Sequence, residues 1–414
     1  MIRLVEALNF RCLRYVRQSL GDFHVLVGPN GSGKTTFLDV VSFLGDLVSV
    51  GLEEAVSSRS QSFPDLVWRK TGDRFELAVE LAFPEGLRRQ LTKPAHSIVR
   101  YEVAIGLQEG GELGILSEKV LLGSAPKATE LKTRPLFPTD VSAPDTVVTS
   151  RKPRGQQTVV SSSRGGLAHF RPETGRGWYP VFHLGASRCA LANLPEDETQ
   201  FPIATWLKSM LGKRVHKLVL NSLAMRKPSP PGQPRRFLPD GSNLPWVVAK
   251  LGENPERHRA WVQHLRTALP DIEDVETVER PEDKHRYLLI RYRNNLRVPS
   301  WAASDGTLRL LALTLPAYLG DLEGVFLIEE PENGIHPRAV GSALESLSSV
   351  YGGQVLLATH SPVVLGIANP SQVLCFARNE SGATDIVPGN RHPALGQWRG
   401  EVSLGVLFAG GVLG

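Results

Sequence analysis

The sequence predicts an α/β fold, and three observations along its 414 residues carry this prediction. Near the N-terminus, a β-branched run at 24–27 (HVLV) meets a glycine-rich loop, and apolar residues at helical spacing follow over 35–50. From Ser304 onward, a helical pattern and a buried strand follow each other twice. Between these ends, residues 74–83 and 98–108 alternate apolar and polar side chains, which is typical of antiparallel strands.

Composition indicates a globular chain with an ordinary core. Hydrophobic residues make up 41% and charged residues 21%, and the net charge of +5 permits a polyanionic partner without requiring one. The three cysteines, Cys12, Cys189 and Cys375, are too far apart for a zinc module or a disulfide framework. The first residues lack a secretory pattern, and charges interrupt the most apolar stretch, 308–328. We therefore expect a cytoplasmic protein with no membrane partner.

A phosphate-binding loop is the most specific motif. Residues 28–35 (GPNGSGKT) fit the pattern G-x-x-x-x-G-K-[ST] at every fixed position. Glycines let backbone amides turn inward around phosphate, a lysine supplies a cation to the β- and γ-oxygens, and a threonine offers its hydroxyl to Mg²⁺. The motif predicts that ATP binds here, through Asn30, Gly31, Ser32, Gly33, Lys34, Thr35 and Thr36.

Two buried strands nearer the C-terminus end in polar residues. Residues 324–332 (GVFLIEEPE) form an apolar run that ends in carboxylates, and ligands bind at the carboxyl ends of such parallel strands. Glu329 would orient a Mg²⁺-bound water, and Glu330 would position and polarise the attacking water. Alone, this pattern also suits a solvated acidic turn. The next strand, 354–358, precedes His360, which can touch a γ-phosphate at the same edge or serve a structural role.

These pieces, in this order, resemble the ATP-binding-cassette ATPases of the RecF/SMC/OLD branch. That branch consists of AAA-family ATPases found in prokaryotic DNA repair and anti-phage defence. The resemblance covers about half of the chain, its two ends. It is carried by 8–11 (LNFR), 28–35 (GPNGSGKT), 304–309 (SDGTLR), 328–337 (IEEPENGIHP) and 359–362 (THSP).

The resemblance implies a Mg²⁺-dependent ATPase with specific residue roles. Glu330 would be the hydrolytic glutamate and His360 the switch histidine. Ser304 and Gly306 of one head would close on the γ-phosphate that another head holds. Family members usually carry aspartate where this chain has Glu329, and one extra methylene separates the two side chains.

The resemblance also divides the chain into three parts. Residues 1–124 would form the N-terminal part of the head, with the phosphate loop and an antiparallel β lobe. Residues 125–285 would form an inserted lobe that is loop-rich at first and then largely helical. Residues 286–414 would complete the head with the Ser304 motif, the acidic strand and His360. We expect the last residues, 402–414, to form a docking helix, and the 54 residues after His360 to be too few for a nuclease domain.

Three functions remain open at this point. The heads could pair on ATP to drive or gate action on double-stranded DNA. Alternatively, ATP could hold a scaffold that restrains or activates a separate effector such as a nuclease. A transporter subunit is disfavoured by the large central lobe and by the Asp-Gly-Thr form of the motif at 305–307. Arg11 is a candidate for a contact to the base or ribose of the nucleotide. Basic residues elsewhere form candidate surfaces for DNA phosphates: Arg151, Lys152, Arg154, Arg164, Arg235, Arg236, Arg257, Arg259, Arg291, Arg293 and Arg297.

Overall fold

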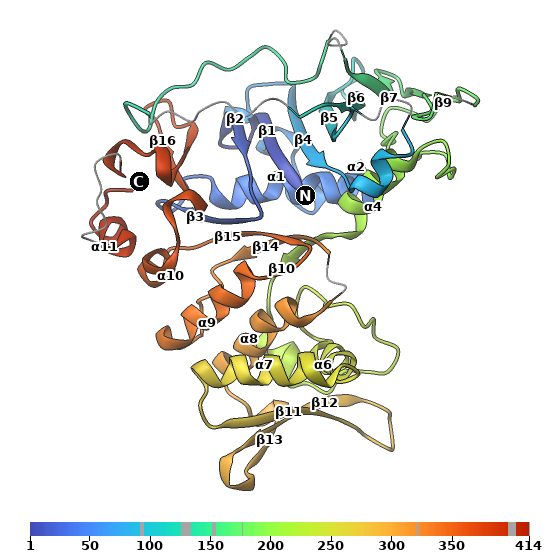
Figure 1. Cartoon of the computed structure of the whole chain (residues 1–414). Helices are drawn as coiled ribbons and strands as arrows, with labels where there is room; N and C mark the ends of the chain where they lie inside the picture. Colours follow the sequence, from blue (N-terminus) through green and yellow to red (C-terminus); the bar gives the residue numbers. More distant parts are fainter. Residues whose placement is uncertain are drawn as a thin grey trace.

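A computed structural model describes residues 1–91, 95–125, 134–150, 155–175, 177–320, 323–395 and 403–413. Its strands form three sheets of eight, six and three strands, with helices between and around them (Figure 1). The α/β class predicted from the sequence is confirmed. Among the described helices, none is both long and apolar enough to cross a bilayer.

The eight-stranded sheet is antiparallel, as the alternation at 74–83 and 98–108 predicts. Its central pairs are long and regular, and the short strands lie at one edge. In spatial order it consists of β2 (Leu13–Ser19), β1 (Ile2–Phe10), β4 (Arg74–Ala82), β5 (Ile98–Leu107), β6 (Leu113–Gly123), β7 (Gln157–Ser163), β8 (Leu167–Phe170) and β9 (Val181–His183).

The six-stranded sheet is parallel except for its last strand, which pairs antiparallel to its neighbour. Because five strands run the same way, their carboxyl ends meet at one edge. The order is β10 (Val215–Leu218), β14 (Gly324–Glu329), β15 (Gly353–Ala358), β3 (Phe23–Val27), β16 (Val373–Arg378) and β17 (Thr384–Pro388).

Helix α1 (Lys34–Ser49) lies between these two sheets and is the centre of one core (Figure 1). Its apolar residues pack against β1, β4 and β5 on one side and against β14 and β15 on the other. Along β14, Val325 and Leu327 belong to this core, whereas Phe326 and Ile328 belong to a second core on the opposite face. Burial on both faces explains why β14 is a continuous apolar run.

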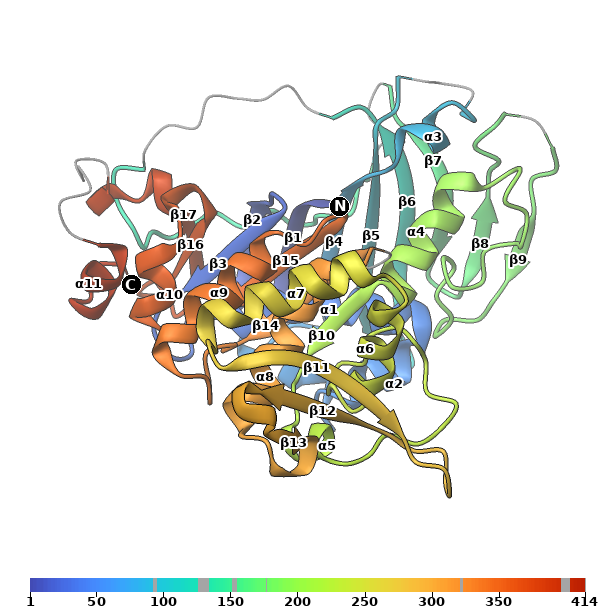
Figure 2. The same ribbon diagram turned by 60° about the horizontal axis from the view of Figure 1, so that its bottom comes forward.

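The second core joins the six-stranded sheet to helices and to a small antiparallel sheet, which Figure 2 shows in front. That sheet contains β11 (Ile272–Glu279), β12 (Arg286–Tyr292) and β13 (Arg297–Pro299). The remaining helices are α2 (Leu52–Ser57), α3 (Glu85–Arg88), α4 (Pro202–Lys213), α5 (Ser222–Arg226), α6 (Leu244–Gly252), α7 (Pro255–Ala268), α8 (Asp305–Thr314), α9 (Pro337–Ser348), α10 (Pro362–Ile367) and α11 (Leu404–Ala409).

The range 125–285 does not stand apart from the rest of the chain. Strands β7 to β9 extend the eight-stranded sheet, β10 pairs with β14, and α4 packs in the core around α1. Val160 and Phe170 are buried on paired strands, although serines and glycines surround them in a stretch expected to be loop. In the C-terminal range, α11 packs on α10 so closely that a side chain at Gly405 would overlap the Pro362 carbonyl oxygen.

Glu173 is a buried carboxylate that caps α4 from outside the helix. No side chain at the N-cap position, Phe201, accepts a bond from the first turn. Instead the backbone amides of Ile203 and Ala204 each donate to a Glu173 carboxylate oxygen at 2.7 Å. These bonds satisfy two amides that the helix leaves without partners. Burial nevertheless raises the pKa of Glu173 to about 7, and the two amides oppose this rise.

This pKa predicts a pH-dependent stability. A carboxyl group with a raised pKa binds its proton more tightly in the folded state, so its stabilisation is present below the unfolded pKa and declines as pH rises to about 7. Urea unfolding between pH 5 and pH 8 should show this decline, up to about 3 kcal/mol. Glu173→Gln should remove that component, while Glu380→Gln, at an exposed carboxylate, should leave it. Equal pH slopes for wild type and Glu173→Gln would contradict the assignment.

Candidate nucleotide-binding site

A cavity of about 350 Å³ lies at the carboxyl edge of the six-stranded sheet. Residues from five stretches of the chain meet there, because four of these stretches end or follow neighbouring strands of this sheet. The cavity is lined by Arg11, Cys12, Asn30, Gly31, Gly33, Lys34, Thr35, Thr36, Glu329, Glu330, Ala358, His360 and Arg378. The structure therefore brings the predicted phosphate loop, acidic strand end and histidine together.

The glycines of the phosphate loop allow a second chain segment to pack on it. Gly28 and Gly33 have φ of +146° and +104°, in the region that favours glycine. A side chain at Gly28 would overlap the Phe376 carbonyl oxygen, and one at Gly33 would overlap the Thr384 hydroxyl. Thr384 also donates to the Ser32 carbonyl oxygen at 2.9 Å. The hairpin of β16 and β17 thus holds the loop from behind.

The loop and the start of α1 carry the donors that a phosphate would need. No side chain caps the N-terminus of α1 within the described ranges, and its first turn holds no acidic residue. The Ser32 hydroxyl oxygen is buried without a hydrogen-bond partner there. Lys34 Nζ donates to the carbonyl oxygens of Gly28 at 2.8 Å and Pro29 at 3.0 Å. Free helix amides with a nearby ammonium group suit a phosphate anion.

Burial gives Lys34 an unusual ionisation. Desolvation lowers the pKa of Lys34 to about 8, and the carboxylates of Glu330 and Glu329 oppose that change. The ammonium group is therefore poorly solvated in the free chain. An anion beside it would restore the missing stabilisation of its charge.

Thr35 and Glu329 form a pair of oxygen ligands. The Thr35 hydroxyl donates to Glu329 Oε2 at 2.6 Å. The other oxygen, Oε1, lies 3.4 Å from Nζ of Lys217, which parallel pairing of β10 with β14 brings to the same edge. Hydroxyl and carboxylate oxygens are the ligands that Mg²⁺ prefers, so these two side chains fit a magnesium ion despite the longer glutamate.

Glu330 is held in a strained conformation. Its φ of +46° lies in the left-handed region, which non-glycine residues rarely adopt. The Glu330 amide donates to the Ala358 carbonyl oxygen at 2.8 Å, and the Asn333 side-chain amide donates to its carboxylate. Strained residues of this kind cluster at functional sites, where surrounding contacts hold them. The carboxylate is thereby fixed at the cavity instead of extending with β14.

His360 follows β15 and faces Lys34 and Glu330 across the cavity. Burial, reinforced by the Lys34 charge, lowers the pKa of His360, while Glu330 and Glu332 oppose the change. The imidazole is therefore neutral at pH 7. Next to it, the Thr359 hydroxyl donates to Glu332, which fixes the loop between the two strand ends.

Two cavity residues, Arg378 and Cys12, and one neighbour of the cavity, Lys217, were not assigned by the sequence motifs. Arg378 ends the apolar run of β16, and an added Cβ at Gly31 would lie 3.4 Å from its Nη2. The Cys12 thiol lies 3.4 Å from the Thr36 hydroxyl. Lys217 reaches Glu329, as described above. The sequence signal that could have identified Arg378 is the apolar run of β16, which ends at this arginine.

Arg11 lines the cavity but is already paired. Its guanidinium lies 3.2 Å from Asp39, which also pairs with Arg59 at 2.7 Å. Its backbone has φ of +51°, and its amide donates to the Leu66 carbonyl oxygen. The contact to the base or ribose stays a prediction.

Ser304 and Gly306 do not line this cavity; they start α8 on the other side of the six-stranded sheet. The Ser304 hydroxyl accepts from the Thr307 amide at 3.1 Å and caps the helix. An added Cβ at Gly306 would lie 2.7 Å from the Gly334 carbonyl oxygen, so packing alone requires glycine there. Ser304 is exposed, as a contact to a second chain would need.

Four of the candidate arginines lie beside acidic side chains, and one of them is Arg164, 3.8 Å from Glu109. Arg291 lies within 4 Å of three carboxylates, and Arg235 pairs with Glu253 at 2.6 Å. Arg293 lies 3.7 Å from Asp271. The cluster at 151–154 lies outside the described residues.

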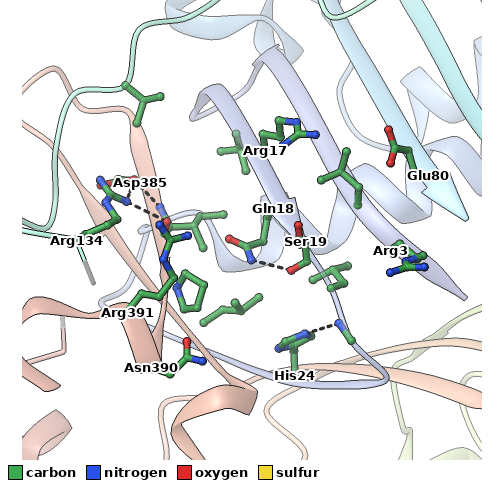
Figure 3. Close-up of a pocket in the computed structure, with 18 of the residues that line it drawn as sticks. Arg3, Arg17, Gln18, Ser19, His24, Glu80, Arg134, Asp385, Asn390 and Arg391 are labelled. Atoms are coloured by element: carbon green, nitrogen blue, oxygen red, sulfur yellow. Dashed lines mark hydrogen bonds and ion pairs between the residues drawn. The ribbon is translucent and has the colours of Figure 1, made fainter. Parts of the chain in front are cut away.

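A larger hollow, of about 860 Å³, is lined by residues of β2 and β17 (Figure 3). Its polar groups are largely used within the chain. Arg134 pairs with Asp385 at 2.8 Å, and both His24 ring nitrogens lie within hydrogen-bond distance of backbone atoms of Gly21 and Gln372. These contacts fix the side chains that line the hollow, and we assign no chemistry to it.

The fold and the site together define a nucleotide-binding head of the P-loop class. Two solved structures share the fold: an Smc head bound to the C-winged helix domain of ScpA, and the Smc head with an extended coiled coil bound to the C-terminal domain of ScpA derived from Pyrococcus furiosus. Their TM-scores are 0.53 and 0.51. Each alignment covers 93% of this chain, and the two alignments cover 96% and 95% of the Smc chains. Identities of 14% and 13% make this a likeness of fold alone.

The chain belongs to the AAA domain family described as putative AbiEii toxin, Type IV TA system, whose model matches residues 23–163 and 201–366. It is also 44% identical over 48 residues to an OLD nuclease of Thermus scotoductus. That stretch spans 11% of this chain and 9% of the nuclease. The resemblance to AAA-family ATPases that the sequence motifs predict is thus confirmed.

Packing of the hairpin on the loop predicts an unequal effect of two glycine substitutions. Gly33→Ala combines a positive φ with overlap against Thr384 and should lower the free energy of unfolding by about 3 kcal/mol or more. Gly382→Ala, in the same hairpin at φ +82° with open space around it, should cost about 1 kcal/mol. Urea unfolding measures both. Equal losses in the free energy of unfolding would contradict tight packing of the hairpin against the phosphate loop.

Proposed function

We propose that the chain hydrolyses ATP with Glu330 as the general base. The observation that carries this proposal is the strained Glu330, held by backbone and side-chain bonds on the cavity that also contains the phosphate loop. In this proposal Glu330 accepts a proton from the attacking water. The new bond forms to the γ-phosphorus, and the bond to the β–γ bridging oxygen breaks, which leaves ADP and phosphate.

The phosphate loop binds the triphosphate in this proposal. Its backbone amides surround the phosphates, and Lys34 moves from the carbonyl oxygens of the loop to the β- and γ-oxygens. His360 donates to or accepts from the γ-phosphate or the water. The contributing binding residues are Asn30, Gly31, Ser32, Gly33, Lys34, Thr35 and Thr36.

Thr35 and Glu329 are the residues that would hold magnesium, since their oxygens converge on one side of the cavity. The ion, when bound, neutralises charge on the triphosphate oxygens. In the chain without the ion, Glu329 accepts a hydrogen bond from Thr35 and pairs with Lys217. Each of its carboxylate oxygens therefore has a donor or a cation beside it.

We further propose that heads pair on ATP, with Ser304 and Gly306 of one chain closing on the γ-phosphate of another. Their place at the start of α8, away from the cavity of their own chain, and the exposure of Ser304 support an action in trans. The paired heads would drive or gate action on double-stranded DNA, in prokaryotic genome maintenance or anti-phage defence. The similarity to Smc heads and to an OLD nuclease supports this setting.

An alternative is a switch that restrains or activates a separate effector such as a nuclease. The neutralised arginines on β12 and around α6 favour it, because they leave less free positive charge for DNA phosphates. The Smc heads bind ScpA domains, which is a precedent for a protein partner.

Glu330→Gln provides the direct test of hydrolysis and pairing. The variant should bind ATP but turn it over about 100-fold or more slowly, because glutamine cannot accept the proton. With ATP it should accumulate as a pair of chains, measured by size exclusion with light scattering. Glu345→Gln, at an exposed position on α9, is the matched control and should behave as wild type.

Turnover like wild type in Glu330→Gln would refute the role of Glu330. The same assay with and without double-stranded DNA separates the two settings. DNA stimulation that disappears in Glu330→Gln would support action on DNA. Slow turnover that ignores DNA, but still requires Glu330, would support the switch.

A further inference from the structure

Arg378 is the one cation of the cavity without a described acceptor. Three side chains there carry a permanent or near-permanent positive charge: Arg11, Lys34 and Arg378. Arg11 pairs with Asp39, and Lys34 donates to two carbonyl oxygens. The Arg378 side chain makes no hydrogen bond or ion pair with any residue in the described part of the chain.

The position of Arg378 is determined by strand pairing rather than by its own contacts. Strand β16 runs parallel to β3, with Cys375 opposite Val27, so β16 ends beside the phosphate loop. The turn that follows is tightly held: Asn379 accepts from the Ala383 amide at 2.9 Å, and Asn379 Nδ2 donates to Asp140 at 2.7 Å. A fixed backbone with a free guanidinium is an arrangement suited to an incoming ligand.

The neighbours of the guanidinium indicate the chemistry of that ligand. Nη2 and Cζ lie 3.4 Å and 3.7 Å from the point where a Cβ of Gly31 would be, so the group lies against the middle of the phosphate loop. Gly31 has no side chain to separate them. The carboxylates of the cavity are engaged elsewhere, Glu329 with Thr35 and Glu330 with Asn333.

We propose that Arg378 binds phosphate oxygens of the nucleoside triphosphate, as a second cation beside Lys34. This inference rests on the proposed function, because it assumes that the loop holds ATP. A guanidinium offers five donors in a planar fork that matches two phosphate oxygens at once. Its neighbour is the loop that cradles phosphate, which favours a phosphate contact over stacking on the base.

The test compares two ligands on three variants. Isothermal titration or competition measures binding of ATP and of inorganic tripolyphosphate, which lacks base and ribose. Arg378→Ala should weaken both about 10- to 100-fold, in keeping with the loss of a charge-assisted hydrogen bond. Arg378→Lys should bind both with intermediate affinity. Arg89→Ala, at an exposed arginine that follows α3, should bind both like wild type.

Each outcome decides the proposal. Wild-type affinity of Arg378→Ala for ATP would overturn it and leave the ATPase proposal intact. A loss for ATP with unchanged tripolyphosphate binding would also overturn it, in favour of a base contact. If wild type itself binds neither ligand, the proposed function fails and this assignment with it. Thermal melting should be unchanged in Arg378→Ala, since the side chain has no described partner to lose.

Discussion

The placement of β3 between β15 and β16 is the constraint on which the site depends. Pairing aligns Leu26 with Ala358 on one side and Val27 with Cys375 on the other. Since these strands are parallel, the loop after β3, the histidine after β15 and the arginine that ends β16 reach one edge. Pairing of β14 with β15 adds Glu329 and Glu330. One sheet order thus assembles residues from both ends of the chain.

Close packing of neighbouring elements fixes the conformation of the phosphate loop. The hairpin of β16 and β17 touches the phosphate loop at Gly28 and Gly33, where any side chain would overlap it. On the opposite side, α1 is enclosed by the two large sheets and begins directly at Lys34. The loop is therefore held between a rigid helix and a rigid hairpin, which prepares its amides before a phosphate arrives.

The sequence predicted the parts of the site that sit in local motifs. The loop at 28–35, the acidic end of β14 and His360 each follow an apolar run that reads as a buried strand, and the structure brings them together. Arg378 and Lys217 were not predicted as site residues, because their place depends on which strands pair over more than a hundred residues. The periodicity of apolar residues in the sequence does not show which distant strands pair.

Dependence on long-range strand pairing also explains why the strands of the range 125–285 were not predicted. Strands β7 and β8 lie in a stretch rich in serine and glycine, where the buried apolar residues are Val159, Val160, Ala168 and Phe170. Their pairing with β6 stabilises strands that their own composition disfavours. Glu173 is a further case: a carboxylate in a proline- and glycine-rich segment becomes a helix cap only because α4 packs beside it.

The central claim is that the cavity of one chain is completed by Ser304 of another, and mixing two inactive variants tests it most directly. Lys34→Ala lacks the phosphate cation, and Ser304→Arg blocks the exposed start of α8; each alone should hydrolyse almost no ATP. An equimolar mixture should recover about a quarter of wild-type turnover, because half of the pairs are mixed and each holds one intact composite site. A mixture as inactive as its parts, with both variants folded, would contradict pairing in trans.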